Sequence, residues 1–315
     1  MPKISVITPC YFNEENIPVT SQKLLDNEKL FDADVEFEYI LVDDGSKDKT
    51  WPELVKFQSR FPHKVKIIKL VRNFSSTNAV FAALPYCTGD CNVIISADLQ
   101  DPPELIHAMY QHWVKGYKLV LANRTNREES AVRKFFANTT HKLVKKFGLQ
   151  NLPDGGFDLN LFDAEVREVL IKMVDRNSYF PYLLIWMGYD FVSIPYVRKK
   201  RELGESKYTV AKNIKAFIDS FVAFSFFPIR AISIAGMGMG LIAFIYGIII
   251  IFGKLYGLVP TTGWSSMMVV ILFVSSFQMT ALGIIGEYVW RGLDASRNRP
   301  AYIVDRVLDE TKIKR

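Results

Sequence analysis

The sequence predicts an α/β fold with a mostly parallel sheet, followed by an interfacial amphipathic helix and two transmembrane helices. In the first two thirds of the chain, short β-branched apolar runs alternate with helical stretches, a pattern typical of a mostly parallel sheet covered on both faces. The last third holds two long apolar runs, each able to cross about 30 Å of hydrocarbon. These observations divide the chain into residues 1–206, 207–228, 229–290 and 291–315.

The first region is expected to alternate strands, each apolar and bounded by turn residues, with helices. Pro9, Asp43 and Asp98 each follow a predicted strand, and α/β proteins gather functional groups at the carboxyl ends of parallel strands. The strands are predicted at residues 4–8, 38–42, 65–71, 92–97 and 118–122, and the helices up to about residue 30, after residue 46, at 78–84 and at 103–115.

An acidic segment follows the strand predicted at 92–97. The Asp98 carboxylate, beside the Gln100 amide, has the oxygen chemistry that suits a hard divalent cation bridging two phosphates. Asp101, with Pro102 and Glu104 after it, fits a helix capping box, which predicts a structural role for Asp101.

A second acidic segment, Asp43-Asp44-Gly-Ser, closes the strand predicted at 38–42. A carboxylate there can accept hydrogen bonds from a nucleobase or from ribose hydroxyls. The same four residues also form a common turn with a helix cap. Both interpretations stay open on the sequence of this segment.

Two groups of basic residues offer fixed positive charge. Arginine side chains match phosphate oxygens in bidentate geometry. Alternatively, either group is a solvated surface or is attracted to anionic lipid. The first group follows the strand at 118–122 and the second precedes the amphipathic helix; they are Arg124, Arg127 and Arg133, and Arg198, Lys199, Lys200, Arg201 and Lys207.

The C-terminal third predicts attachment to a membrane. Apolar residues recur at helical spacing over 207–227 with lysines on the other side, which favours an interfacial helix over an ordinary surface helix. The transmembrane helices are predicted at 231–252 and 265–289, with arginines outside both spans and Lys254 between them. The positive-inside rule therefore places the large domain and both termini in the cytoplasm. No signal peptide is expected, because the first residues lead straight into a strand.

The composition of the chain indicates which kinds of molecule it binds. The net charge of +6 favours phosphates or anionic lipid headgroups, and no nucleic-acid-binding motif is present, so no nucleic acid partner is expected. Cys10, Cys87 and Cys91 lack zinc-site spacing and are predicted to be reduced and buried. The spacing of Gly236 and Gly240 allows helix packing, so a homo-oligomer stays open beside the alternative of an incidental small-residue face.

In combination, six segments of the chain resemble the motifs of family 2 glycosyltransferases, in the same order. The likeness is closest to the polyprenyl-phosphate type, which includes bactoprenol glucosyltransferase and dolichol-phosphate mannose synthase, and it covers nearly the whole chain. The segments are Ile-Thr-Pro9-Cys-Tyr-Phe-Asn-Glu-Glu-Asn, Val-Asp43-Asp-Gly-Ser, Arg72-Asn-Phe, Ala-Asp98-Leu-Gln-Asp-Pro-Pro-Glu, Gly155-Gly-Phe-Asp-Leu and Arg201-Glu-Leu-Gly-Glu-Ser-Lys207-Tyr.

This resemblance implies a GT-A fold and inverting transfer of one sugar from a UDP- or GDP-linked nucleotide-sugar to polyprenyl (undecaprenyl) phosphate at the cytoplasmic face of the plasma membrane. It implies that Asp98 and Gln100 hold Mg²⁺ or Mn²⁺ against the donor diphosphate. The implied nucleoside pocket contains Pro9, Tyr11, Glu14, Asp43 and Asp44, and the implied phosphate ligands are Arg124, Arg127, Arg133, Arg198, Arg201, Ser206 and Lys207.

The chain departs from the family pattern at three places. Ser96 replaces the first acid of the usual Asp-Ala-Asp, so the metal site has one carboxylate fewer. Phe12 is an extra residue before Asn13. The family often shows Gly-Asp-Phe-Arg-Leu where this chain has residues 155–159, which leaves Asp158 and Asp154 as candidates for a base or an acceptor-site ligand.

The expected reaction is a single displacement at the sugar C1, driven by positioning and by charge stabilisation of the leaving diphosphate. A phosphate monoester is already anionic near neutral pH, so a general base is dispensable. Two alternatives remain: a processive polysaccharide synthase, and a catalytically silent scaffold or sensor that binds nucleotide-sugar or anionic lipid. The sequence lacks the Gln-x-x-Arg-Trp motif and the additional spans of the first, whereas Ser96 and the shifted Asp158 keep the second open.

Overall fold

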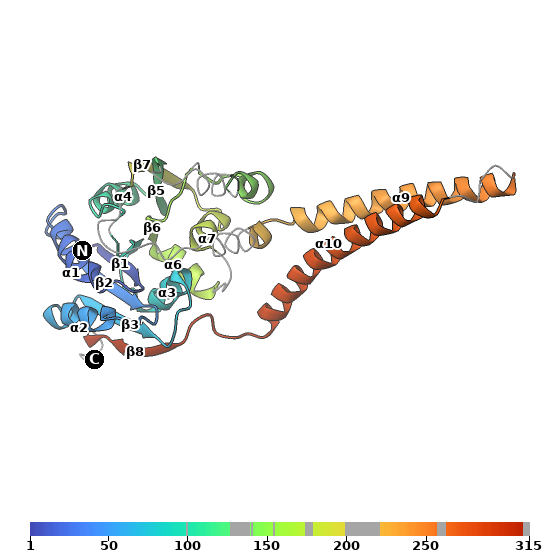
Figure 1. Cartoon of the computed structure of the whole chain (residues 1–315). Coiled ribbons are helices and arrows are strands. Elements are labelled where there is room, and N and C mark those ends of the chain that lie inside the picture. Colours follow the sequence, from blue (N-terminus) through green and yellow to red (C-terminus); the bar gives the residue numbers. More distant parts are fainter. Residues whose placement is uncertain are drawn as a thin grey trace. The chain divides into compact units, whose positions relative to one another are not determined.

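The computed structural model describes residues 1–98, 100–126, 139, 141–153, 155–173, 179–198, 221–256 and 263–310 (Figure 1). The chain forms two compact units, one made of Met1–Ala223 with Pro300–Arg315 and the other of Phe224–Arg299.

The strands of the first unit form one sheet. They are β1 (Lys3–Cys10), β2 (Glu36–Asp43), β3 (Val65–Leu70), β4 (Cys91–Ile94), β5 (Leu119–Asn126), β6 (Asn160–Asp163), β7 (Phe191–Val197) and β8 (Val304–Leu308). Their order is β7-β5-β6-β4-β1-β2-β3-β8. The predicted strands are near-continuous apolar runs because both faces of this sheet are covered, and the prediction of a mostly parallel sheet is confirmed.

Strand direction brings the functional segments to one edge of the sheet. β1 is parallel to β2 and β4, β2 is parallel to β3, and β5 is parallel to β7. The short β6 is antiparallel to both β4 and β5, so β4 and β5 run the same way. The carboxyl ends of β1, β2, β3, β4, β5 and β7 therefore lie at a common edge.

Helices cover both faces of the sheet (Figure 1). Those of the first unit are α1 (Asn16–Glu28), α2 (Thr50–Arg60), α3 (Ser76–Ala83), α4 (Leu105–Val114), α6 (Ala164–Lys172) and α7 (Phe180–Trp186). Apolar side chains of α1, α2 and α4, such as Ile17, Leu54 and Met109, join one core cluster with β-strand residues. On the other face the Phe180 ring of α7 lies 5.5 Å from Phe81 of α3 and 6.1 Å from Phe162 of β6.

The second unit contains two long helices, α9 (Phe227–Leu255) and α10 (Trp264–Ser296). Their apolar segments, Phe227–Ile250 and Met267–Ser296, have mean hydropathies of 2.1 and 2.2 and no buried share. Both are long and apolar enough to cross a membrane, so the prediction of two such helices is confirmed. Of the predicted amphipathic helix, residues 207–220 lie outside the described part of the chain, whereas residues 221–224 are helical.

The last strand was not predicted from the sequence. After α10 the chain re-enters the first unit, and β8 pairs antiparallel with β3, with Ile68 opposite Val307. The Val71 amide also donates to the Ile303 carbonyl at 3.1 Å. The five residues of this strand, Val-Asp-Arg-Val-Leu, do not alternate apolar and polar residues, so no local pattern distinguishes them from an unstructured tail.

Candidate active site

The adjacent ends of β1 and β2 hold a buried carboxylate. Cys10 is paired with Asp43 in the sheet, and the Asp44 amide donates to the Cys10 carbonyl at 2.9 Å. Asp43 is fully buried; its Oδ1 accepts from the Ser46 amide at 2.9 Å, and its Oδ2 has no hydrogen-bond partner among the described residues. Burial raises the pKa of Asp43. An unpaired buried carboxylate oxygen is costly in isolation, so a ligand that donates to it there is favoured.

Asp44 holds the loop that follows β3. Its two carboxylate oxygens accept from the amides of Phe74 at 2.6 Å and Ser75 at 3.1 Å. Burial raises the pKa of Asp44 to about 7, against the opposing effect of these two hydrogen bonds. Ser75 has a positive φ of 88°, a conformation that costs free energy in a residue other than glycine. The structure thus engages Asp44 with backbone amides rather than leaving it directed at solvent.

Gly45 explains how these two loops approach each other. Its φ is +70°, and a Cβ atom built on it would lie 2.5 Å from the carbonyl carbon of Arg72. Only a glycine permits both the left-handed turn and the close contact. The turn after β2 and the loop after β3 therefore form one joined wall beside Asp43.

The segment after β1 accommodates its extra residue in a left-handed turn. Phe12 has a φ of 54°, and its amide donates to the Ser46 Oγ at 3.0 Å. Pro9 is half-buried, and Tyr11 is 36% exposed at the same edge. The Glu14 carboxylate accepts from the Lys49 amide at 2.8 Å, at the start of α2. Glu14 therefore lies against the first turn of α2.

Asp98 follows β4 at the same edge. It is buried, and its Oδ1 accepts from the backbone amide of Gln100 at 3.3 Å, which orients the Asp98 carboxylate. The described residues contain no group of three or more His, Cys, Asp or Glu that could hold a metal ion. Mg²⁺ is usually bound by one or two carboxylates together with water and substrate phosphates rather than by a complete protein cage. The oxygen donors of Asp98 and Gln100 fit that mode of binding.

Charged and phenolic side chains meet beyond β5 and β7, in what we call the β5–β7 cluster. Arg124 of β5 is 8% exposed and donates to the Asp158 carboxylate, which also accepts from the Tyr179 hydroxyl. Burial works to lower the pKa of Arg124, but the charge of Asp158 outweighs it and the pKa is raised. The members of the cluster are Asp101, Arg124, Asp158, Tyr179, Tyr196 and Arg198.

The predicted capping role of Asp101 is wrong. The N-cap of α4 is Glu104, which has no side-chain cap hydrogen bond within the described residues. Asp101 is 1% exposed, accepts from the Tyr196 hydroxyl, and lies 3.2 Å from the Arg198 Nε. Burial raises the pKa of Asp101 and Arg198 opposes that shift. A buried carboxylate gains more from a guanidinium than from a helix terminus.

Sequence reasoning missed Tyr179 and Tyr196 as members of this site. Tyr196 lies in β7, which ends at Val197, and the predicted phosphate ligand Arg198 comes directly after that strand. No such proximity in the sequence links Tyr179 to Asp158, 21 positions earlier. Six predicted site residues lie outside the described residues: Arg127, Arg133, Asp154, Arg201, Ser206 and Lys207.

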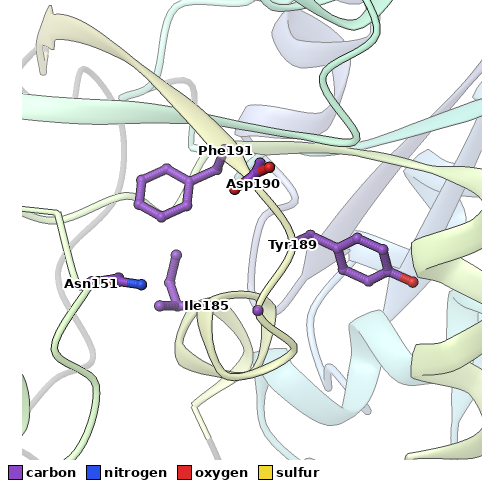
Figure 2. A pocket seen from close by; sticks show the side chains of 6 residues that line it. Asn151, Ile185, Tyr189, Asp190 and Phe191 are labelled. Carbon is purple, nitrogen blue, oxygen red and sulfur yellow. The ribbon is translucent and has the colours of Figure 1, made fainter.

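A separate hollow of about 340 Å³ lies at the start of β7 (Figure 2). Figure 2 shows Asn151, Ile185 and Phe191 facing the same space. Because β7 begins at Phe191, this hollow is at the end of the strand opposite to the candidate site. It contains none of the predicted site residues.

Comparison with known proteins identifies the family. The model of the family described as "Glycosyl transferase family 2" matches residues 5–170. The uncharacterized glycosyltransferase YkcC of Bacillus subtilis is 35% identical over 303 residues, which are 96% of this chain and 93% of the relative. A prophage bactoprenol glucosyl transferase homolog of Escherichia coli is 31% identical over 97% of this chain and 99% of its own length. The undecaprenyl-phosphate 4-deoxy-4-formamido-L-arabinose transferase of Photorhabdus laumondii is 28% identical over 98% and 95%. This chain therefore belongs to glycosyl transferase family 2 and is a glycosyltransferase.

Proposed function

We propose that this enzyme transfers one sugar, with inversion, from a UDP- or GDP-linked donor to undecaprenyl phosphate. One observation carries the proposal: a single chain combines a carboxylate and arginine site at one sheet edge with two helices long and apolar enough to span a membrane. An acceptor with a polyprenyl tail stays in the bilayer, which explains why the enzyme needs those helices. The names of two full-length relatives, for bactoprenol and for undecaprenyl phosphate, support the same acceptor class.

The donor binds at the ends of β1, β2 and β4. The Asp43 Oδ2, unpaired among the described residues, accepts a hydrogen bond from the base or the ribose, and Pro9 and Tyr11 complete the nucleoside pocket. Asp44 and Glu14 support this pocket from behind, by binding backbone amides of the loop after β3 and of the start of α2. Asp98 and Gln100 hold Mg²⁺ or Mn²⁺, which when bound neutralises charge on the donor diphosphate.

The acceptor phosphate attacks the sugar C1 from the face opposite the diphosphate. A bond forms between C1 and a phosphate oxygen, and the bond between C1 and the diphosphate oxygen breaks, with both electrons leaving on the nucleoside diphosphate. Arg124 and Arg198 supply fixed positive charge for the phosphates, together with Arg127, Arg133, Arg201, Ser206 and Lys207. Asp158 and Asp154 are the acids available as a base or as an acceptor-site ligand.

In the membrane arrangement that we propose, the helix at 207–228 lies at the interface and α9 and α10 cross the bilayer. The catalytic domain and both termini lie on the cytoplasmic side of the inner membrane. Pairing of β8 with β3 supports this arrangement, because it keeps the residues after the second span on the side of the catalytic domain.

A homo-oligomer formed through the membrane helices is part of the same proposal. A Cβ atom at Gly236 would lie 3.8 Å from the Phe277 ring of α10, so this glycine already faces a helix of its own chain. A Cβ atom at Gly240 would meet no described residue within 4 Å. Gly240 therefore offers a small-residue surface for packing against a second copy.

A radiolabelled-sugar transfer assay tests the function. Protein purified in detergent receives undecaprenyl phosphate, Mg²⁺ or Mn²⁺, and a panel of UDP- and GDP-sugars, and label is followed into the organic phase. We expect one donor to label the lipid with a single sugar, and Asp98→Ala to abolish the transfer. Glu165→Gln, at the opposite end of the strands, is the matched control and should retain activity. Products with several sugars would indicate a processive synthase, and nucleotide binding without any transfer would indicate a scaffold or sensor.

A further inference from the structure

We infer that Asp158 and Tyr179 are positioning residues that hold the Arg124 guanidinium for the acceptor phosphate, and that Asp158 is not the proton acceptor of the reaction. This inference rests on the proposed transfer to a polyprenyl phosphate. It concerns how the chain prepares a cationic subsite at the ends of β5 and β7.

Both oxygens of Asp158 are engaged by the protein. Oδ2 accepts from the Arg124 Nη2, Oδ1 accepts from the Tyr179 hydroxyl, and the Arg198 Nη1 lies 4.0 Å from Oδ2. Taking a proton from the acceptor would neutralise the carboxylate and remove the negative charge that holds the Arg124 guanidinium. Because a phosphate monoester is already ionised, nothing in the displacement requires that proton transfer. The contacts of Asp158 are those of a carboxylate that orients a guanidinium.

The backbone next to Asp158 also helps to position the Arg124 guanidinium. The Arg124 amide donates to the Gly156 carbonyl at 2.9 Å, and the Arg124 guanidinium lies against the Cα of Gly156. A Cβ atom at position 156 would overlap the Arg124 Nη2 and lie 2.8 Å from its Cζ. The absence of a side chain at Gly156 is therefore what allows Arg124 to reach Asp158.

The sheet order indicates which phosphate this subsite takes. The residues proposed for the nucleoside and the metal follow β1, β2 and β4, which are neighbours in the sheet. Arg124 and Asp158 belong to β5 and to the chain just before β6, on the other side of β4. With the donor along β2-β1-β4, its sugar points towards β6 and β5, and the group there is the acceptor phosphate.

Three substitutions displace the Arg124 guanidinium in different ways. Asp158→Asn removes the charge but keeps an acceptor oxygen. Tyr179→Phe removes one hydroxyl. Gly156→Ala keeps every charge and adds one methyl group, and the atom it meets is the far end of a flexible side chain, so the guanidinium moves while the backbone remains in place.

The experiment measures acceptor affinity and turnover separately. Farnesyl phosphate binding to the detergent-purified full chain is measured by calorimetry, with farnesol as the control that lacks the phosphate. The KM for undecaprenyl phosphate, the KM for the donor and the pH profile of kcat come from the transfer assay. For all three variants we expect the Kd and the KM for the acceptor to rise about tenfold, because the acceptor phosphate loses one charge-assisted hydrogen bond. The donor KM and the shape of the pH profile should not change.

The chain supplies a matched control at the opposite ends of β5 and β6. There the Glu165 carboxylate accepts from Lys118 and is 3.3 Å from the Tyr189 hydroxyl, the same combination of cation, carboxylate and tyrosine on an exposed surface. Glu165→Gln and Tyr189→Phe should leave acceptor affinity and turnover unchanged.

The outcomes separate this inference from the proposed function. If Asp158→Asn lowers kcat at least a hundredfold and removes the low-pH limb of the profile, while Tyr179→Phe and Gly156→Ala have little effect, Asp158 is the base and the inference is wrong. Unchanged acceptor affinity in all three variants of an active enzyme also overturns it. A wild-type protein that transfers no sugar to lipid contradicts the proposed function itself, whatever the variants bind.

Discussion

Glu38 and Lys66 form an ion pair inside the sheet, far along the strands from the candidate site. Both side chains are 2% exposed, and the Lys66 Nζ lies 3.0 Å from the Glu38 Oε2. Lys66 also donates to the Tyr86 carbonyl at 2.7 Å, and Glu38 accepts from the Ser5 hydroxyl and the Thr88 amide. These bonds connect β1, β2 and β3 with the turn before β4.

Glu38→Gln should destabilise the protein strongly, because it leaves the Lys66 ammonium buried without its main counter-ion. Breaking a buried pair in this way costs about 3 kcal/mol of unfolding free energy, which urea unfolding in detergent would measure. Glu53→Gln is the control: Glu53 pairs with Lys56, whose side chain is 70% exposed, and its loss should cost less than about 1 kcal/mol. If both substitutions lowered the unfolding free energy equally, the Glu38–Lys66 pair would not be a stabilising buried ion pair.

The same pair predicts the response to acid. Burial works to raise the pKa of Glu38, but the hydrogen bonds from Ser5 and Thr88 and the charge of Lys66 lower it from 4.5 to about 2. The stabilisation is therefore complete above the unfolded pKa of 4.5 and is lost as the pH falls towards 2. The difference in unfolding free energy between the wild type and Glu38→Gln should shrink over this range. A difference that stays constant between these pH values would show that the pair does not titrate in this way.

At the scale of elements, the turn between β2 and α2 determines the shape of the nucleoside wall. Gly45→Ala should weaken nucleotide binding and lower the stability of the protein, for two reasons. The new methyl group would lie 2.5 Å from the Arg72 backbone, and alanine is strained at a positive φ. Gly116 is the matched control, since it has a φ of +98° with no described residue within 4 Å of its Cβ position. Gly116→Ala should cost only the left-handed strain of about 1 kcal/mol, with nucleotide affinity unchanged in a calorimetric titration.

Sequence predicted the elements that carry strong local patterns. Predicted strands and helices before residue 123 fall within a few positions of the observed ones, because buried parallel strands are apolar throughout and their ends carry turn residues. β6 and β8 are short strands of four and five residues, and pairing with distant partners defines them. Asp43, Asp98 and Arg124 could be proposed as site residues from the sequence because each lies at or near the carboxyl end of a predicted strand. The pairing of Asp158 with Arg124 and Tyr179 depends on tertiary contacts that no local pattern contains.

For the whole molecule, the proposed topology can be tested by thiol labelling. Cys10, Cys87 and Cys91 are buried at 1%, 6% and 0% exposure, so the background should be low. A membrane-impermeant maleimide applied to spheroplasts should label Tyr256→Cys, after α9, where the native side chain is 77% exposed. Lys29→Cys, after α1, should react only once the membrane is opened. Labelling of both positions in sealed cells, or of neither, would contradict the topology.

β8 gives the chain a second connection to its catalytic domain. The backbone leaves the first unit after Ala223 and returns at Pro300, and β8 then adds to the edge of β3 by main-chain hydrogen bonds. Strand addition of this kind is also a recognition mode between separate chains. A nick between the domain and α9 would therefore leave the membrane part attached to the sheet through its own terminal strand. We predict that fragments 1–223 and 224–315, separated by such a nick, stay associated through the pairing of β8 with β3.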